Sequence, residues 1–323
     1  MAWLGKVLGR RAGTVGNVRV DELCGDAAAH EWAARLGRVE WRGFGDFLRT
    51  QQDIETRDFY MRTLPTKLKG WPSWLDEWVE SAPEDAMART FRAARSTRYA
   101  WEARGGGYAE TVKRESWPLF FSRLDAAESD LVVASNLTPD DPGPWVAMIT
   151  VAMGKSMGID EVRRRFAEVE RRHPNHAQAC QQVLQAVAAK WGGSHELMFE
   201  FARSVGVRAP EGSAAHAVIA TAHYEFWIAE KAGNMGYFKR PDIRAEIAEA
   251  ARRCFTSSGD SPRTLIARGS FAMLYMVMNE AALAVEQIDL AGGIVAEPLS
   301  WVPNVGALVA QARLIARKQA ART

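Results

Sequence analysis

The sequence has few cysteines and no long hydrophobic run. Its three cysteines, Cys24, Cys180 and Cys254, lie far apart and form no C-x-x-C pair, so neither a disulfide framework nor a cysteine zinc site is expected. No apolar segment approaches the length of about 18 residues that a membrane-spanning helix needs, and the first residues lack the apolar stretch of a signal peptide. The chain is therefore expected to be cytoplasmic, with no transmembrane segment.

An excess of charge of one sign is also missing. The 41 lysines and arginines nearly balance the 39 aspartates and glutamates, which leaves a formal net charge of +2. Dedicated nucleic-acid-binding proteins usually carry a basic surplus. The densest basic cluster, at residues 163–165 and 171–172, is interleaved with glutamates, a pattern typical of a solvated helix face. Nucleic acid is therefore not an expected partner.

Complete nucleotide-binding and catalytic motifs are scarce as well. Gly154, Lys155 and Ser156 match the end of a phosphate-binding loop, but Ile149 stands where that loop needs a glycine, and a helix is expected before it. The cysteines lack any signature of a reactive thiolate. The sequence therefore predicts no catalytic residue and no cofactor.

Two histidines come nearest to a metal site. His216 and His223 lie seven residues apart and Glu230 follows after another seven, so the three share one face of a predicted helix. A His/His/Glu set can bind zinc, but no H-E-x-x-H pair accompanies it. We therefore predict no metal site and expect structural or surface histidines.

Helical periodicity is what the sequence has in abundance. Apolar residues recur at steps of three and four through most of the chain, and β-branched runs with period two are almost absent. Glycine and proline punctuate the pattern, which predicts roughly fourteen helices in an all-α fold. The clearest stripe consists of Phe120, Leu124, Ala127, Leu131 and Ala134.

Internal repetition indicates how these helices are arranged. Residues 142–174 resemble a tetratricopeptide (TPR) repeat, a helix pair of about 34 residues, and the register restarts over residues 177–207. The pattern predicts a TPR-like right-handed α-solenoid of antiparallel helix pairs, irregular in its N-terminal third. We expect one domain over residues 25–323, preceded by an N-terminal arm over residues 1–24.

Four stretches strengthen this fold by resemblance to a family. They are A-W-E-A-R-G-G-G-Y-A (100–109), W-V-A-M-I-T-V-A-M-G (145–154), A-K-W-G-G-S (189–194) and M-G-Y-F-K-R-P-D (235–242). In content and order they resemble an uncharacterised bacterial family with TPR-like, tetratricopeptide-like helical repeats. The resemblance implies the fold, and it implies no biochemical activity.

Tryptophan is unusually frequent, with 12 residues beside only 6 tyrosines. Most are expected to fill space between stacked helices, but tryptophan and arginine are also the side chains that most often anchor a partner. Ends of first-type helices line the mouth of a TPR groove, and Arg98 and Glu102 are spaced to pair there. The candidate partner-binding residues are Arg98, Trp101, Glu102, Arg104, Trp145, Lys190 and Trp191.

The expected function is that of an interaction scaffold or adaptor, which holds a peptide or protein segment in the concave groove of the solenoid. One alternative is an enzyme or small-ligand-binding protein whose site is assembled across several helices, around Glu102, Arg104, His216 and His223. A structural subunit or self-assembling homodimer is a third. The sequence does not identify the partner.

Overall fold

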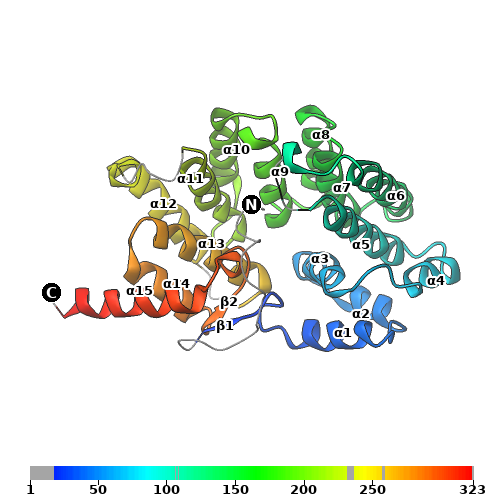
Figure 1. Ribbon diagram of the computed structural model, residues 1–323, viewed down its shortest axis with the longest axis horizontal. Helices are drawn as coiled ribbons and strands as arrows, with labels where there is room; N and C mark the ends of the chain where they lie inside the picture. Colours follow the sequence, from blue (N-terminus) through cyan, green and yellow to red (C-terminus); the bar gives the residue numbers. More distant parts are fainter. Residues whose placement is uncertain (1–17, 106, 108, 231–235, 257–258, 322–323) are drawn as a thin grey trace. The chain divides into compact units, whose positions relative to one another are not determined.

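The computed structural model describes residues 18–105, 107, 109–230, 236–256 and 259–321. These residues form fifteen α-helices and a single pair of two-residue strands, which confirms the predicted all-α class (Figure 1). Where the sequence predicts one domain over 25–323, the described residues group into two compact units. Unit 1 comprises residues 26–186, and unit 2 comprises 18–25 and 187–321.

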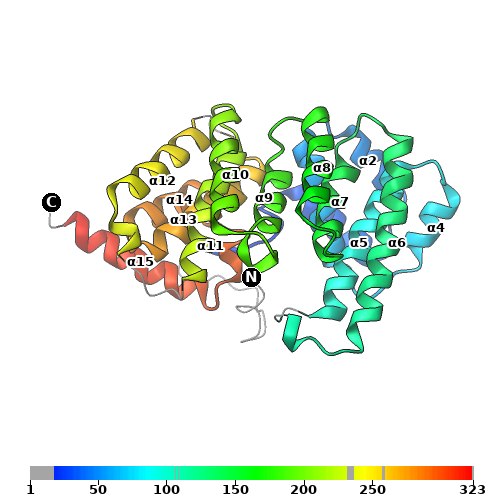
Figure 2. The ribbon, with the colours of Figure 1, turned by 90° about the horizontal axis from the view of Figure 1, so that it is seen from above.

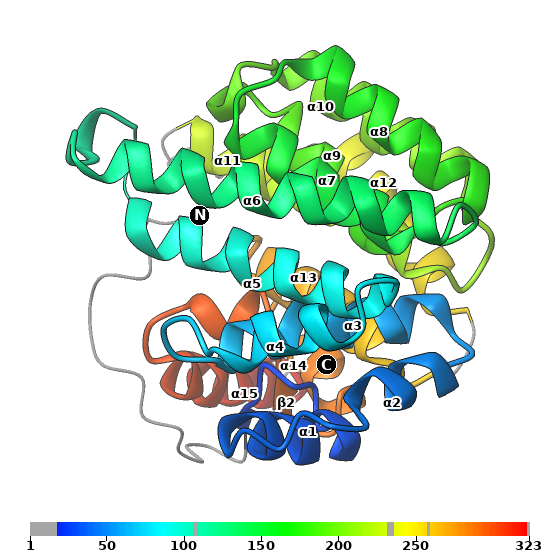
Figure 3. The ribbon, with the colours of Figure 1, turned by 90° about the vertical axis from the view of Figure 1, so that its right-hand side faces the viewer.

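The described residues of unit 1 form nine α-helices. In chain order these are α1 (Ala27–Gly37), α2 (Phe44–Thr50), α3 (Ile54–Thr63), α4 (Trp74–Ser81), α5 (Ala86–Arg104), α6 (Ser116–Leu137), α7 (Gly143–Gly154), α8 (Ile159–Arg172) and α9 (Ala177–Ala186). The long helices α5 and α6 pack along each other, α7 packs on α6 and α8, and α9 packs on α7 and α8. The α5–α6 hairpin extends past the ends of α7 and α8 (Figures 2 and 3).

The predicted stripe on residues 120–134 is the buried side of α6. All five of its side chains are at most 1% exposed, because steps of three and four residues place them on one face of the helix. Four of them, Phe120, Leu124, Ala127 and Leu131, form a core cluster with Met148 and Val151 of α7 and with Ala93 and Ala100 of α5.

Four of the tryptophans lie in the core of unit 1. Trp41 stacks on both Trp74 and Trp78, with ring centroids about 6 Å apart, and Trp32 contacts Phe44 at 4.9 Å. All four indoles are at most 8% exposed. These tryptophans are therefore packing residues, as expected of large aromatic side chains between helices.

The described residues of unit 2 form six α-helices and two short strands. They are β1 (Arg19–Val20), α10 (His195–Arg208), α11 (Ala217–Ala229), α12 (Pro241–Cys254), α13 (Pro262–Val277), α14 (Ala281–Leu290), β2 (Ile294–Val295) and α15 (Val305–Ala320). The strands run parallel, with Arg19 opposite Ile294 and Val20 opposite Val295. No sequence pattern predicts them, because two residues are too short to show an alternation.

The predicted arm over residues 1–24 is described only in part, since residues 1–17 lie outside the described residues. The remainder is integrated into unit 2 through β1. Val18 is 1% exposed, and the Asp21 amide donates a hydrogen bond to the Val295 carbonyl at 3.0 Å. Residues 18–24 are thus a docked segment, held by partners almost at the other end of the chain.

The first predicted repeat, residues 142–174, corresponds to α7 and α8. The second, residues 177–207, is divided, because α9 belongs to unit 1 and α10 to unit 2. Within the described residues, every helix is too short or too polar to cross a membrane.

Candidate functional site

The last two turns of α5 carry four of the seven predicted binding residues. Asp85 begins this helix by accepting a hydrogen bond from the Met87 amide, and the helix ends at Gly105. The φ of Gly105 is 79°, a value that glycine adopts without strain. The residues that the structure brings together here are Arg98, Trp101, Glu102 and Arg104.

Trp101 is half-buried where α5, α6 and α7 meet. Its indole contacts Phe120 edge to face, with ring centroids 5.0 Å apart. On α7, Gly154 lies close to the same cluster: a Cβ added there would lie 2.8 Å from a methyl carbon of Leu124 and 3.4 Å from an indole carbon of Trp101. Trp101 is therefore in part a packing residue, and its side chain is only partly exposed.

Arg104 covers the open side of two indoles. Its guanidinium carbon lies 5.2 Å from the ring centroid of Trp101 and 5.4 Å from that of Trp117. Its Nη1 donates to the carbonyls of Gly105 at 3.3 Å and Gly107 at 3.0 Å. Partial burial lowers the pKa of Arg104, and no carboxylate of the described residues lies within ion-pair distance of it. The guanidinium thus keeps a charge that the surrounding residues do not balance.

Glu102 remains partly exposed and is held by two arginines of the same helix, α5. The predicted pair with Arg98 is present, with a distance of 3.3 Å from Nε to Oε1. The stronger partner is Arg95, which donates to both carboxylate oxygens at 2.9 and 3.0 Å. Burial opposes ionisation of Glu102, but the arginines outweigh it, so the pKa of Glu102 lies below its usual range. Glu102 therefore has a structural role, which its spacing from Arg98 alone does not reveal.

Trp145, near the start of α7, is half-buried between the core and α8. It packs against the core cluster of α5, α6 and α7. Arg172 lies 5.1 Å and Arg164 5.8 Å from its ring centroid. Its indole Nε1 is buried without a hydrogen-bond partner among the described residues. Trp145 is thus covered by arginines of its own unit.

Lys190 and Trp191 lie in unit 2, and their expected position at the end of a first-type helix is wrong. Helix α9 already ends at Ala186, and Ala188 has extended backbone, with ψ at 151°. The two residues lie in a short 3-10 helix, η4 (Ala189–Trp191). Lys190 Nζ forms an ion pair of 2.7 Å with Glu225, a side chain of α11 that is only 6% exposed. This lysine therefore compensates a buried charge, a role that depends on a residue 35 positions away.

The structure also reveals an uncovered apolar surface, which the sequence analysis missed. Five large apolar side chains of α6 are exposed, between 38% and 47%. No other element of unit 1 lies in front of α6 in Figure 3. We call the exposed positions of this helix the α6 outer face; they are Pro118, Leu119, Phe121, Ser122, Asp125, Ala126, Ser129, Val132, Val133, Asn136 and Leu137. The sequence did contain a signal for this surface: large apolar residues such as Val132 and Val133 lie on the same helix outside its buried stripe.

The turn after α7 contains two patterns that resemble functional motifs, the end of a phosphate-binding loop at Gly154 to Ser156 and a G-x-S-x-G pattern. Residues 154–158, Gly-Lys-Ser-Met-Gly, match the G-x-S-x-G spacing of a nucleophile elbow, which requires a preceding strand. Here the preceding element is a helix, and Ser156, with φ at 53°, ends it in a Schellman motif. Lys155 pairs with Asp125 at 2.7 Å and Glu128 at 2.5 Å. Helix termination and ion pairing thus account for the residues of this turn.

The two histidines that the sequence places on one helical face with Glu230 have separate partners. His216 precedes α11, in the 3-10 helix η5 (Ala214–His216), and its Nε2 donates to the Pro210 carbonyl at 3.0 Å. His223 contacts the Tyr237 hydroxyl at 2.6 Å and Glu246 at 3.3 Å. The prediction that the two histidines share one face of a helix is therefore wrong, because α11 begins at Ala217 and His216 belongs to the preceding 3-10 helix. Glu102 and Arg104 of the alternative enzyme site lie in unit 1, and these histidines lie in unit 2.

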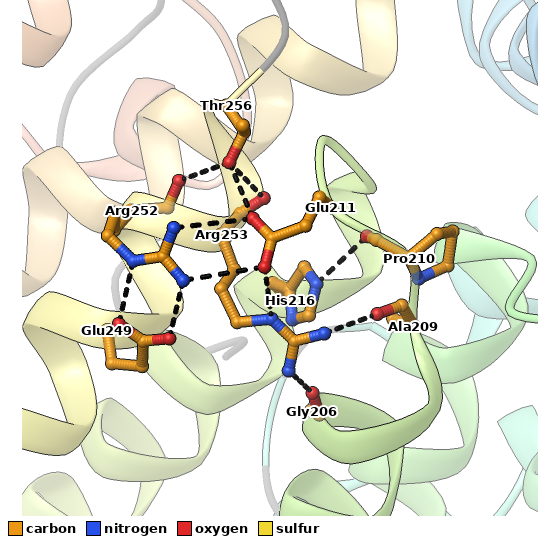
Figure 4. A network of polar contacts seen from close by, with 9 residues as sticks. All are labelled: Gly206, Ala209, Pro210, Glu211, His216, Glu249, Arg252, Arg253 and Thr256. Atoms are coloured by element: carbon orange, nitrogen blue, oxygen red, sulfur yellow. Dashed lines mark hydrogen bonds and ion pairs between the residues drawn. The ribbon is translucent and has the colours of Figure 1, made fainter.

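Figure 4 shows the polar network beside His216, which ties the end of α10 to α12. Arg253 donates to the carbonyls of Gly206 and Ala209 and to Glu211. Glu211 also accepts hydrogen bonds from Arg252 and Thr256. Arg253 satisfies carbonyls that the end of a helix leaves without partners. This network therefore stabilises a helix end, and its charges are balanced internally.

The contact between α11 and α12 predicts a pH dependence. His223, and after it Arg203, hold the pKa of Glu246 at about 2, against an unfolded value near 4.5. A lowered carboxyl pKa stabilises the fold above pH 4.5, and this contribution is lost as the pH falls toward 2. We expect Glu246→Gln to remove about 2 kcal/mol of the acid-dependent loss of unfolding free energy in that window, measured by denaturant titrations at several pH values.

The matched control for that experiment is Glu249→Gln, one turn further along α12. Its side chain is 56% exposed and pairs only at the surface with Arg252. This variant should follow the pH dependence of the wild type closely. Equal curves for the two variants would contradict a special role for Glu246.

Comparison with known proteins adds no assignment: no model of a known protein family matches the chain, and no curated protein matches it significantly.

Proposed function

We propose that this chain is a protein–protein interaction module in which unit 1 binds a segment of another protein along the α6 outer face. The observation that carries the proposal is the exposure of five large apolar side chains on one helix. Leu119 and Phe121 lie near the start of α6 and Val132, Val133 and Leu137 near its end, with the small or polar residues Ser122, Asp125, Ala126 and Ser129 exposed between them. Large apolar side chains exposed in such number on one helix are typical of an interaction site. Asp125, the only charged residue of the face, is already paired with Lys155, so the face favours an uncharged partner segment with apolar side chains.

The proposal also includes three predictions made from the sequence, which concern the fold, the family resemblance and the location in the cell. We propose a TPR-like, right-handed α-solenoid, supported by the packing of successive helices α5 on α6, α7 on α8, α10 on α11 and α13 on α14. Resemblance to the uncharacterised TPR-like family and a cytoplasmic location belong to the same proposal. Of the groove candidates, Trp101 and Arg104 are partly exposed, and they lie at the end of α5.

Replacing Val132 and Val133 together with serine is expected to weaken partner binding at least about tenfold. Both side chains are exposed, so the melting temperature should change little. Affinity capture from native cell extract, quantified by mass spectrometry against the wild type, measures the effect.

The matched control is Val207→Ser, a valine of α10 that is 79% exposed. The proposal requires one protein retained in stoichiometric amount by the wild type and by Val207→Ser, and lost with the double variant. Retention by all three proteins, or capture of a second copy of this chain only, would contradict it.

A further inference from the structure

Arg104 is a cation without a carboxylate partner at the end of the α5–α6 hairpin where the connecting loop begins. Two other partly buried arginines of unit 1 do have such partners: Arg57 pairs with Asp141 at 2.8 Å, and Arg92 pairs with Asp130 at 2.7 Å. Arg123, like Arg104, has a carbonyl and an aromatic ring instead. Arg104 has only two carbonyls and two indole faces. Its Nε and Nη2 have no partner among the described residues. An arginine fork in this state is complementary to a planar carboxylate.

The charges around Arg104 do not supply this carboxylate. Glu102, on the same helix, is engaged by Arg95 and Arg98. On the connection to α6, Glu110 and Glu115 are exposed and matched in number by Lys113 and Arg114. Three arginines, Arg95, Arg98 and Arg104, thus lie near one carboxylate, Glu102, and Arg104 is the one that does not pair with it.

Arg104 is continuous with the α6 outer face through Trp117. The Trp117 ring lies under the guanidinium at 5.4 Å and stacks on Phe121 with centroids 5.6 Å apart. Phe121 is 40% exposed, and the next large apolar side chains exposed on α6 are Val132, Val133 and Leu137, beyond the exposed Ser122, Asp125, Ala126 and Ser129. A helix of 22 residues is about 33 Å long, a length that about ten residues of extended chain can follow.

We infer that the occupant of the α6 outer face is a segment of another protein that carries an aspartate or glutamate at one end, bound by Arg104, followed by apolar side chains along α6. This inference rests on the function proposed above. A carboxylate fits, because the two free groups of the Arg104 fork, Nε and Nη2, match the two oxygens of one carboxylate. The indoles of Trp101 and Trp117 hold the guanidinium in place, and their rings exclude water from one side of the ion pair.

The test uses two synthetic pools of fluorescent twelve-residue peptides and the full chain. One pool has Asp or Glu at the first two positions and Leu, Val, Ile or Phe at alternate positions after them. The matched pool has Asn or Gln instead of the acids. We expect the acidic pool to bind the wild type about tenfold more tightly, as a charge-assisted hydrogen bond predicts. Arg104→Gln should remove this preference, and Arg104→Lys should keep part of it.

Arg171→Gln is the control, because Arg171 is an exposed arginine of α8 in the same unit and pairs with Glu168 at 3.4 Å; it should leave the preference intact. Indole N–H resonances provide a readout that does not depend on a variant's folding. The Trp117 signal should shift on adding the acidic pool, and that of Trp191 in unit 2 should not.

Equal binding of both pools, lost with the Val132/Val133 double serine variant, would overturn the inference and leave the proposed function standing. The same holds if neither pool binds while the wild type still captures its native partner. Failure of both peptide binding and partner capture would overturn the proposed function as well.

Discussion

Replacing Arg95 with methionine is expected to destabilise unit 1 by about 3 kcal/mol. The Arg95 side chain is fully buried. It donates two hydrogen bonds to the Gly70 carbonyl, at 2.6 and 3.0 Å, and two to Glu102. Methionine keeps much of the volume but leaves these acceptors without their donor, and lost charge-assisted hydrogen bonds carry the largest penalties. Denaturant unfolding followed by circular dichroism measures the change.

Arg98→Met is the matched control, because Arg98 pairs with the same carboxylate but is 49% exposed. An exposed ion pair contributes little, so this variant should lose less than about 1 kcal/mol. Losses of equal size would show that the pairing of Glu102, rather than burial of Arg95, decides the stability.

Replacing Gly193 with alanine is expected to destabilise unit 2 by about 3 kcal/mol. A Cβ at this position would lie 1.8 Å from the Val187 carbonyl oxygen and 2.3 Å from its carbon. These are backbone atoms, so the turn itself must move. That carbonyl accepts the Ser194 amide at 3.1 Å, and Ser194 in turn caps α10. Thermal unfolding and the loss of protection from hydrogen exchange at the start of α10 measure the effect.

Gly192→Ala separates this clash from the general cost of removing a glycine. Gly192 has φ at 90°, and a Cβ there would meet nothing within 4 Å. Only the backbone strain remains, which costs about 1 kcal/mol. If Gly193→Ala proved as mild as Gly192→Ala, the close approach to Val187 would not be a constraint on this turn.

Local patterns predicted the parts of the fold that depend on spacing along one helix. The stripe from Phe120 to Ala134 is the buried side of α6, and Arg98 does pair with Glu102. Both follow from helix geometry, which fixes the neighbours three and four positions away. The same geometry failed for Trp191, because α9 ends at Ala186 and the assumed helix does not reach it.

Contacts between distant segments were beyond these patterns. Lys190 is spaced like a groove residue, yet its partner is Glu225 on α11. Arg95, the stronger partner of Glu102, lies seven positions away on the same helix, and what spacing could not predict is its burial against the loop that contributes the Gly70 carbonyl. Whether a side chain pairs within the protein or can bind a ligand depends on which other helix or loop packs against it.

The sequence by itself determined the all-α class and the buried side of α6, because helix periodicity is a local property. Only the tertiary structure decided that Lys190 and Glu102 are neutralised internally and that Arg104 keeps an unbalanced charge above two indoles. It also decided that one side of α6 remains uncovered. The physical reason is that exposure and charge compensation arise from the packing of several helices, whereas periodicity describes one helix at a time.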